Sequence, residues 1–542
     1  MTARIAIATA EPGMFETLRT HLLAAGVDPE NLHDKQLMTT DQTNEWLIAN
    51  DTELLVLDAG LPMDPRVHRD TRTTVAAQDL LSTVVQARDP HTSVLVIAPS
   101  FGACPDLEQE CSRADNALIL PMDALQLHRH RILKPFIAML TGHPDEKGAI
   151  PGAFRVIETE IHSAKVECRL GTGDDGSPML RWNTVSDLDD LKSAARDYGR
   201  DEIPQDRADA DHWIGTSLPK NWLAQTRGVG TRLFKSFVVK AIGEHLFSQI
   251  ERAAGGLAGL SFRFVINDAG YYPVPFEASV RYLAEENGPF VLLHAPIVRR
   301  VPSAIRLQRG ARAERGRIEP GSRLMFVRSQ VGEHPDRKLE RVICDGKTFD
   351  KLGNIDVELQ YLKELAGAGC FELEVVDLSG TPSNEAVPHL LQRLAHFRPS
   401  ILHYAGHAWS DGQKTVSLVL PGTRPEEAIG LKLDRMVASE GLSTATLVYL
   451  SACRGISRGS VQQLVMNGIP YALGFRWNVE DDRAPHFAKA FYSELHETRS
   501  VCLAFRKACR ASWERLADDE DSPIWLSPIL LAQSTDWATR CN

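Results

Sequence analysis

Two residues in the sequence have the types and the spacing of a base and a nucleophile. His407 follows the apolar run 400–404 (SILHY), and Cys453 follows the apolar run 446–450 (TLVYL). They are 46 residues apart, which leaves room for one crossover helix between two parallel strands. Adjacent parallel strands place their carboxyl ends side by side, at the edge where open α/β sheets build binding sites. A nearby imidazole lowers the pKa of a thiol and converts it to the nucleophilic thiolate.

Each of these residues also has an ordinary structural interpretation. A single cysteine at a strand end is most often a small buried apolar residue, and a single histidine is usually a satisfied core or surface group. The 46-residue spacing, Gly406 and the pair Ser451–Ala452 together favour a catalytic dyad. His403 lies four residues before His407, but Tyr404 stands where the zinc motif HExxH requires Glu. We therefore expect no metal, and we expect His403 to pack beneath the dyad or to orient a loop.

The elements that must position the dyad belong to a large α/β unit that starts near residue 226. Apolar runs predict strands at residues 260–266, within 289–301, and at 323–327, 371–376, 400–404, 446–450 and 471–475. Amphipathic patterns predict helices at residues 232–253, 357–366, 384–395, 431–439, 461–467, 483–497 and 501–517. Strands that alternate with helices indicate a largely parallel sheet with right-handed crossovers.

The segment HYAGHA (403–408), followed by LSAC (450–453), resembles the CHAT domain, a branch of the caspase-like cysteine peptidases grouped with separases and metacaspases. FRFVINDAGYYPVPFEA (262–278) resembles the family's strand that leads to a Pro–hydrophobic–Glu motif. The segment 467–495 is similar to the one that follows the family's cysteine, and 522–531 is similar to its closing strand. The resemblance covers roughly residues 226–535. It implies a caspase-like α/β sheet and a cysteine endopeptidase that cleaves protein substrates.

By this resemblance, His407 is the base and Cys453 the nucleophile of a reaction that passes through an acyl-enzyme. The oxyanion hole uses the backbone N–H of Cys453 and that of the residue after the histidine. That residue is usually Gly in the family and is Ala408 here. Ala408 supplies the same N–H, although alanine is penalised at positive φ. One such donor contributes about 3 kcal/mol in the transition state.

Asp481 and Asp482 are the candidate substrate-binding residues. They follow FRWNVE (475–480), where the resemblance implies an acid that pairs with a basic substrate side chain. An aspartate buried in a pocket selects Arg or Lys by charge pairing. The alternative is a helix cap, because Asp482 directly precedes an amphipathic run that starts near Arg483. The pattern favours the pocket for Asp481 and the cap for Asp482.

Residues 1–145 predict a separate, doubly wound α/β sheet. Parallel strands are expected at 4–8, 53–57, 93–98 and 117–120, and helices at 15–25, 41–49 and 74–87. The order and spacing resemble a response-regulator receiver domain, with Asp58 at the position of the phospho-acceptor. Glu11 is the only acid near the first strand, and Leu120 or Pro121 stands where a receiver has lysine. We therefore expect a degenerate receiver-like module; Asp58 as a strand-end cap is the alternative.

Residues 146–225 predict a β-hairpin followed by a charged linker. Residues 156–170 and 179–182 alternate around a Gly- and Asp-rich turn, and residues 187–212 are rich in Asp and Glu. Residues 226–542 would then form the CHAT-like peptidase domain.

The composition narrows the range of partners. The 542 residues carry a formal net charge of −11, and the pI is near 5.9. Such an acidic chain lacks the positive field that would attract nucleic acids or anionic membranes. No apolar run approaches the roughly 20 residues that span a bilayer. The nine cysteines form no CxxC pair, which argues against a disulfide framework and a zinc ribbon. We expect a cytoplasmic protein that uses no cofactor and whose partners are a protein substrate and a regulatory protein.

Three functions fit these observations. The first is a cysteine endopeptidase that its N-terminal modules gate, similar to bacterial caspase-like proteases in signalling or anti-phage defence. The second is a catalytically silent CHAT-like scaffold. The third is a signalling protein in which Asp58 is phosphorylated and the C-terminal unit is the output. The natural substrate, the activating signal, the oligomeric state and any processing do not follow from the sequence.

Overall fold

The structure is a computed structural model of the chain, and it divides into two compact units. Unit 1 consists of Met1–Thr159, Ala164–Leu188 and Lys235–Leu260, and unit 2 of Glu160–Ser163, Asp189–Phe234 and Ser261–Asn542. The residues described are 4–24, 27–63, 75–87, 92–98, 104, 107, 117–122, 155–171, 179–200, 222–272, 274–281, 288–301, 318–334, 337–344, 346–379, 381, 383–410, 416–422, 424, 426–437, 440–452, 460–476, 483–515 and 523–533.

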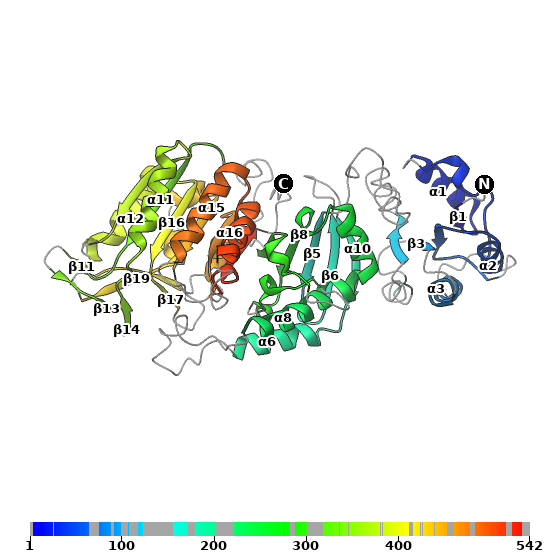
Figure 1. Cartoon of the computed structure of the whole chain (residues 1–542), viewed down its shortest axis with the longest axis horizontal. Coiled ribbons are helices and arrows are strands. Elements are labelled where there is room, and N and C mark those ends of the chain that lie inside the picture. Colours follow the sequence, from blue (N-terminus) through cyan, green and yellow to red (C-terminus); the bar gives the residue numbers. More distant parts are fainter. Residues whose placement is uncertain are drawn as a thin grey trace. The chain divides into compact units, whose positions relative to one another are not determined.

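Unit 1 contains a four-stranded parallel sheet at the blue end of the chain in Figure 1. Its strands, in spatial order, are β1 (Ile5–Ala8), β2 (Leu54–Asp58), β3 (Ser93–Ala98) and β4 (Ala117–Pro121). Its helices are α1 (Pro12–Ala24), α2 (Thr40–Ala49) and α3 (Val75–Ala87). These bounds confirm the predicted strands and helices to within a few residues. The likeness to a receiver domain stays a prediction.

Asp58 ends β2 and is fully buried. Its carboxylate accepts hydrogen bonds from the Thr9 hydroxyl at 2.8 Å and from the backbone N–H of Gly60 at 3.0 Å. These bonds tie the end of β2 to the turn that follows it and to the end of β1. Asp58 therefore acts at least as a structural acceptor, and its phosphorylation stays a prediction.

Unit 1 also contains β6 (Val166–Gly171) and β7 (Met179–Val185), which pair antiparallel as the predicted hairpin requires. The predicted turn between them lies outside the described residues. The strand β5 (Val156–Ile161) precedes them in the chain, and the helix α6 (Asp189–Arg200), which belongs to unit 2, follows. The hairpin and the helical part of the charged stretch are thus both present.

Unit 2 is a mixed α/β structure with a large central sheet. In spatial order its strands are β15 (Phe371–Asp377), β10 (Ser322–Ser329), β16 (Ile401–Gly406), β20 (Leu447–Ser451), β21 (Tyr471–Phe475), β22 (Pro528–Gln533), β9 (Ile297–Val301) and β8 (Ser261–Ile266). The first five are parallel to one another, as expected. The closing strand β22 runs antiparallel to β21 and parallel to β9.

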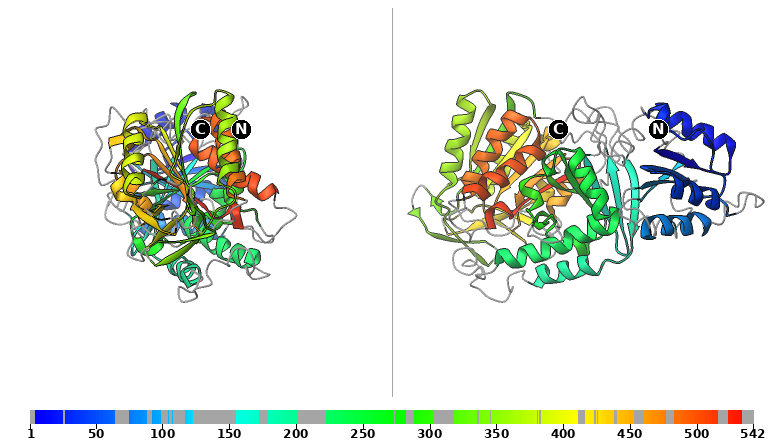
Figure 2. Two further views of the ribbon diagram at one scale, coloured as in Figure 1. Left: turned by 90° about the vertical axis from the view of Figure 1, so that its left-hand side faces the viewer. Right: turned by 45° about the vertical axis from the view of Figure 1, so that its right-hand side comes forward.

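Helices cover both faces of this sheet (Figure 2). They include α11 (Ile355–Gly367), α12 (Ser383–Phe397), α13 (Leu433–Val437), α14 (Ser460–Met466), α15 (Ala484–Thr498) and α16 (Val501–Arg515). Tyr404 of β16 belongs to the apolar cluster that also contains Leu390 of α12 and Leu464 of α14. The next residue back, His403, contacts Tyr492 of α15 instead. Successive side chains thus point to opposite faces, and both faces are buried, which explains the uninterrupted apolar runs.

Two predicted helices were wrong in part. The helix expected over 232–253 is broken: α8 (Trp222–Phe234) runs into a π-helical turn and then into α9 (Lys240–Ile242), and Gly243 separates α9 from α10 (Glu244–Ala253). Gly243 has φ 79° and ψ 149°, a conformation that glycine adopts without steric cost. The helix expected over 431–439 begins as the strand β19 (Ala428–Lys432), because Leu431 pairs with Leu418 of β18 (Val416–Pro421).

Small antiparallel elements that the sequence did not predict lie beyond the carboxyl end of β16. The strands β17 (Ala408–Ser410), β18 and β19 form one sheet, and β13 (Arg341–Cys344) and β14 (Lys347–Asp350) form a hairpin. Their apolar side chains share a small core made of Val331, Val342, Cys344, Val419 and Ala428. The crossover from β16 to β20 therefore contains strands as well as the short helix α13.

A buried ion cluster joins β9 to the end of β21. Glu277, which is fully buried, accepts hydrogen bonds from Arg299 Nε at 2.8 Å and Nη2 at 2.6 Å, and from Arg476 Nη2 at 2.6 Å. Burial alone would raise the pKa of Glu277, but the two guanidinium groups outweigh it and hold this pKa below its usual value. Glu277 belongs to the Pro–hydrophobic–Glu motif, so the motif has a structural role.

We expect Glu277→Gln to lower the free energy of unfolding by about 3–5 kcal/mol, because it leaves two buried guanidinium groups without their counter-ion. The control is Glu372→Gln, which removes a half-exposed partner of Arg323 and costs about 1 kcal/mol or less. Urea unfolding of the full chain measures both. Equal losses in the two variants would contradict the role of the cluster.

The same substitution has a pH signature. Since the folded pKa of Glu277 lies below the unfolded value, its contribution is complete above pH 4.5 and is lost as the pH falls through the folded pKa. The stability difference between the wild type and Glu277→Gln should therefore shrink on acidification below that pH.

Candidate active site

The carboxyl ends of β16 and β20 are level at the edge of the sheet. The two strands are parallel neighbours, and Ala405 pairs with Ser451 in their register. Two residues beyond this pair, the chain reaches His407 in one case and Cys453 in the other. Cys453 itself lies outside the described residues, so its side chain is not placed. The expectation that the two strands are parallel neighbours is confirmed as far as the pair Ala405–Ser451.

The ring of His407 is oriented by a backbone carbonyl. Its Nε2 lies 2.6 Å from the carbonyl oxygen of Asp350, at the end of the hairpin β13–β14. A carbonyl only accepts, so Nε2 carries the proton, and the lone pair of the neutral ring is on Nδ1. The ring of Phe349 packs beside the imidazole, with the ring centres 5.2 Å apart. His407 is thereby held in the tautomer in which Nδ1 can accept a proton.

The Tyr404 hydroxyl fixes the backbone at His407. The buried Tyr404 hydroxyl lies 2.8 Å from the carbonyl oxygens of His407 and of Val419. Burial raises the pKa of Tyr404, so the hydroxyl stays protonated and can donate. Gly406 makes this approach possible, because a Cβ there would lie 2.6 Å from the Tyr404 hydroxyl and 2.9 Å from the Ser329 carbonyl oxygen.

Ala408 starts β17 opposite Leu418. Val419 N–H donates to the His407 carbonyl at 2.9 Å, so Ala408 and Leu418 are the non-hydrogen-bonded pair, whose N–H groups point away from this ladder. Among the described residues other than glycine, only Arg398 and Arg499 have positive φ. Alanine therefore causes no strain at position 408, and its N–H is not used by β18.

A buried polar network lies beneath the ends of the two strands. Glu358 of α11 accepts a hydrogen bond from the Ser451 hydroxyl at 3.0 Å, and its other oxygen lies 3.2 Å from Nε2 of His403. Nδ1 of His403 is 2.9 Å from the Tyr492 hydroxyl. Burial, reinforced by the negative charge of Glu358, raises the pKa of Tyr492 and of Tyr449 well above their usual value. His403 is thus a core residue of the strand end.

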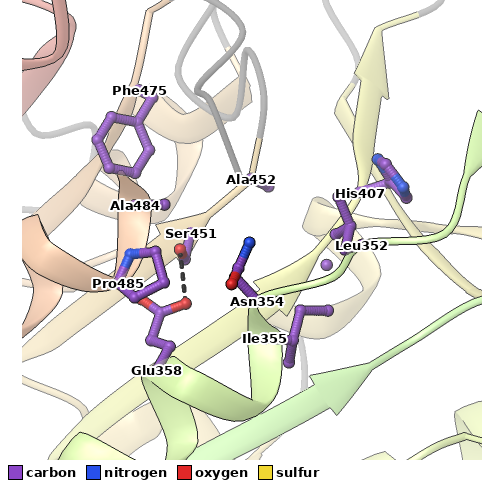
Figure 3. Close-up of a pocket in the computed structure, with 11 residues that line it drawn as sticks. Leu352, Asn354, Ile355, Glu358, His407, Ser451, Ala452, Phe475, Ala484 and Pro485 are labelled. Carbon is purple, nitrogen blue, oxygen red and sulfur yellow. Dashed lines mark hydrogen bonds between the residues drawn. The ribbon is translucent and has the colours of Figure 1, made fainter. Parts of the chain in front are cut away.

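A pocket opens between His407 and this network (Figure 3). The cavity itself is small, about 30 Å³. Glu358 and Ser451 lie on one side and His407 on the other, and Asn354 lies between them in the view of Figure 3. The remaining walls are mostly apolar: Leu352, Ile355, Gly406, Ala452, Phe475, Ala484 and Pro485.

Three predicted site residues, Cys453, Asp481 and Asp482, lie outside the described residues. The structure does bear on the alternative for Asp482, because α15 begins at Ala484 and its N-cap residue is Arg483. The helix therefore starts one residue later than a cap at Asp482 requires.

Sequence reasoning missed two parts of the site. The carbonyl of Asp350 has no sequence signal, since every residue carries this group. Glu358 had one: it is an acid at a buried position of an amphipathic helix, and such positions are rarely charged without a partner. The carbonyl of Asp350 orients the ring of His407, and Glu358 is an acid in the wall of the pocket.

The comparison with protein families matches residues 238–539, more than half of the chain, to the CHAT domain. The chain belongs to the CHAT domain family. The matched region contains the whole pocket, His407 and Cys453. The resemblance noted in the sequence is thus confirmed for this part of the chain.

Solved structures of cysteine proteases are distantly similar to the chain. Gingipain R (RgpB) of Porphyromonas gingivalis, an Arg-specific cysteine proteinase, has 11% identity and a TM-score of 0.35, with 72% of this chain and 78% of that chain covered. A Saccharomyces cerevisiae separase–securin complex has 9% identity and a TM-score of 0.36, with 96% and 37% covered, so the CHAT protein spans little more than a third of that chain.

Caspase-1 from Spodoptera frugiperda has 13% identity and a TM-score of 0.27, with 43% of this chain and 95% of that chain covered. The comparison with curated proteins finds no match. None of these similarities assigns a role to a residue of the CHAT protein.

We expect Gly406→Ala to lower the free energy of unfolding by about 1–3 kcal/mol, because the added methyl group overlaps the Tyr404 hydroxyl and the Ser329 carbonyl. The matched control is Gly367→Ala at the end of α11, where a Cβ meets nothing within 4 Å. Thermal unfolding of the two variants compares them directly. If Gly406→Ala is as stable as the control, the close approach does not constrain the strand end.

Proposed function

We propose that this CHAT protein is a caspase-like cysteine endopeptidase, with Cys453 as nucleophile and His407 as base. The observation that carries the proposal is the parallel register of β16 with β20, because the chain continues from the pair Ala405–Ser451 to His407 and to Cys453. Neighbouring strands are about 4.8 Å apart, so the two backbones leave the sheet close together. In this proposal Nδ1 takes the proton, because Nε2 faces the carbonyl of Asp350.

The proposed reaction begins when Nδ1 of His407 takes the proton of the Cys453 thiol, and the thiolate attacks the carbonyl carbon of the scissile peptide. The N–H groups of Cys453 and Ala408 stabilise the oxyanion. The imidazolium then protonates the departing amine as the C–N bond breaks, which leaves a thioester. His407 next deprotonates a water that hydrolyses the thioester and restores the thiol.

The finer features of this function are proposals as well. Asp481 and Asp482 would contact the substrate, and the receiver-like residues 1–145 would gate the peptidase in answer to a regulatory protein. The setting would be cytoplasmic signalling or anti-phage defence. Among the described residues, no helix combines the length and the apolarity that crossing a bilayer requires.

The dyad is tested by cleavage of casein and of a fluorogenic peptide library. We expect Cys453→Ala to abolish turnover and His407→Gln to lower it about 1,000-fold or more, because each removes one half of a coupled unit. His389→Gln, on the exposed side of α12, and Cys104→Ala, in the core of unit 1, should leave turnover unchanged.

Iodoacetamide labelling gives an independent measurement at neutral pH. The described cysteines (Cys104, Cys168, Cys344, Cys370, Cys502 and Cys509) are all buried. Burial raises the pKa of Cys168 to about 12, so such thiols react slowly. Cys453 should be alkylated fastest, and His407→Gln should slow it. Similar rates throughout, with no turnover, would favour the silent scaffold.

Deletion of residues 1–145 should raise turnover of the fluorogenic peptides severalfold if the N-terminal module restrains the peptidase. The reason is that about 225 residues precede the CHAT region without an enzymatic motif of their own, while an unrestrained peptidase would damage its cell. Circular dichroism establishes that the shortened chain is folded. Unchanged turnover in a folded, shortened protein would show that the module is not an inhibitory gate.

A further inference from the structure

One short segment of the chain carries the oxygen that orients His407 and part of the pocket wall. The segment, residues 350–356, runs from the end of β14 into the first turn of α11. The Asp350 carbonyl faces Nε2 of His407 at 2.6 Å. Three residues of the segment line the pocket (Figure 3): Leu352, Asn354 and Ile355. Between β14 and α11 the segment belongs to no strand or helix, so its backbone needs partners other than a ladder.

Gln330, directly after β10, binds both backbone groups of one residue in this segment. Its Nε2 donates to the Leu352 carbonyl, and its Oε1 accepts from the Leu352 N–H at 3.3 Å. Gln330 is only 2% exposed, so water competes little for these bonds. A side-chain amide offers a donor and an acceptor together, whereas an ionised carboxylate only accepts. Gln330 thus holds Leu352 as a neighbouring strand would.

Arg328, two residues before Gln330, holds the far end of the segment. This buried side chain donates to Asp356 from Nε at 2.7 Å and from Nη2 at 3.0 Å. The bidentate pair lies in the first turn of α11 and holds the pKa of Asp356 below its usual value. Glu333 at 3.0 Å and Asp377 at 3.3 Å are further acceptors of the same guanidinium. Because carboxylates contact it on several sides, Arg328 is fixed in position, and Asp356 with it.

Glu333 links Arg328 to the residue next to Asp350. It starts the short strand β11 (Glu333–His334). One of its oxygens accepts from Nη2 of Arg328, and the other lies 3.4 Å from Nζ of Lys351. The pair with Lys351 is about a quarter exposed at both ends, so it contributes less than a buried pair. The segment is therefore held at its start, its middle and its end by residues in or just after β10.

We propose that Gln330 and Arg328 are positioning residues for His407, because they hold segment 350–356 where the Asp350 carbonyl keeps the proton of His407 on Nε2. The strand β10 is the neighbour of β16 and has no part in the proposed dyad. The inference rests on the proposed function only for its effect on turnover, since the position of the proton can be measured without turnover. The alternative is that Gln330 and Arg328 stabilise the fold without any influence on His407.

The first experiment measures which nitrogen of His407 carries the proton, by heteronuclear NMR of the full chain labelled at histidine nitrogen. It is made at a pH where the ring is neutral. The Cys453→Ala background removes the thiol, so the result does not depend on the dyad, and His407→Gln assigns the signal. Nε2 should carry the proton in most molecules. A ring protonated mainly on Nδ1 would overturn the proposal, whether or not any further variant folds.

Gln330→Glu keeps an acceptor for the Leu352 N–H but replaces the donor with a carboxylate oxygen that repels the Leu352 carbonyl. It should lower the ratio of the Nε2-protonated to the Nδ1-protonated ring about 5-fold, the factor that one ordinary hydrogen bond contributes. Arg328→Lys keeps the charge but loses the bidentate pair with Asp356, so it should shift the ratio in the same direction.

Two control variants separate this effect from a change in charge or in stability. Gln360→Glu makes the same change at an exposed position of α11, and Phe505→Ala removes buried packing in α16. Both should keep the ratio of the parent protein. An unchanged ratio in folded Gln330→Glu and Arg328→Lys would overturn the proposal, and so would an equal shift in Phe505→Ala.

A second experiment relates the proton position to turnover. With Cys453 present, Gln330→Glu should lower kcat on the fluorogenic peptides about 5-fold or more, whereas Gln360→Glu should not change it. A shifted ratio with unchanged kcat in an active enzyme would overturn the role in the reaction. A shifted ratio without any Cys453-dependent cleavage would refute the peptidase and support the positioning. Cys453-dependent cleavage with an unchanged ratio in Gln330→Glu would support the peptidase and overturn the positioning.

Discussion

The parallel pairing of β16 with β20 is the constraint on which the rest of the site depends. It sets the ends of two strands level, so two segments that are 46 residues apart in the chain leave the sheet together. Other contacts at this edge then orient the backbone beyond the strand ends. Tyr404 fixes the backbone at His407, and the antiparallel pairing of β17 with β18 turns the Ala408 N–H away from its own ladder.

Two buried glutamates of unit 2, Glu277 and Glu358, have different surroundings. Glu277 with Arg299 and Arg476 is a closed ion cluster, in which each carboxylate oxygen has a guanidinium donor. Glu358 lies at the pocket wall and has one oxygen without a hydrogen bond. The first arrangement is that of a structural support, because each carboxylate oxygen has a donor.

The sequence predicted the parallel strands of unit 2 well, because each is a continuous apolar run that is buried on both faces. It also predicted that His407 follows the end of a buried strand, and the structure places this residue directly after β16. It did not predict the elements whose stability comes from tertiary packing, such as the hairpin β13–β14, where Val342 and Cys344 pack under Val419. Nor did it indicate the break at Gly243, since an amphipathic pattern continues across it. Glu358 was missed because its burial and its contacts with Ser451 and His403 are visible only in the structure.

The acceptor that orients His407 is a main-chain oxygen at the end of a hairpin, and this has a consequence for how the site can vary. Any amino acid at position 350 presents the same oxygen, so this residue can be substituted without changing the orientation of the imidazole. The number of residues in the hairpin is not free, because one insertion or deletion would move the oxygen along the strand. Related chains should thus differ widely in side chains here while keeping the length of the loop constant.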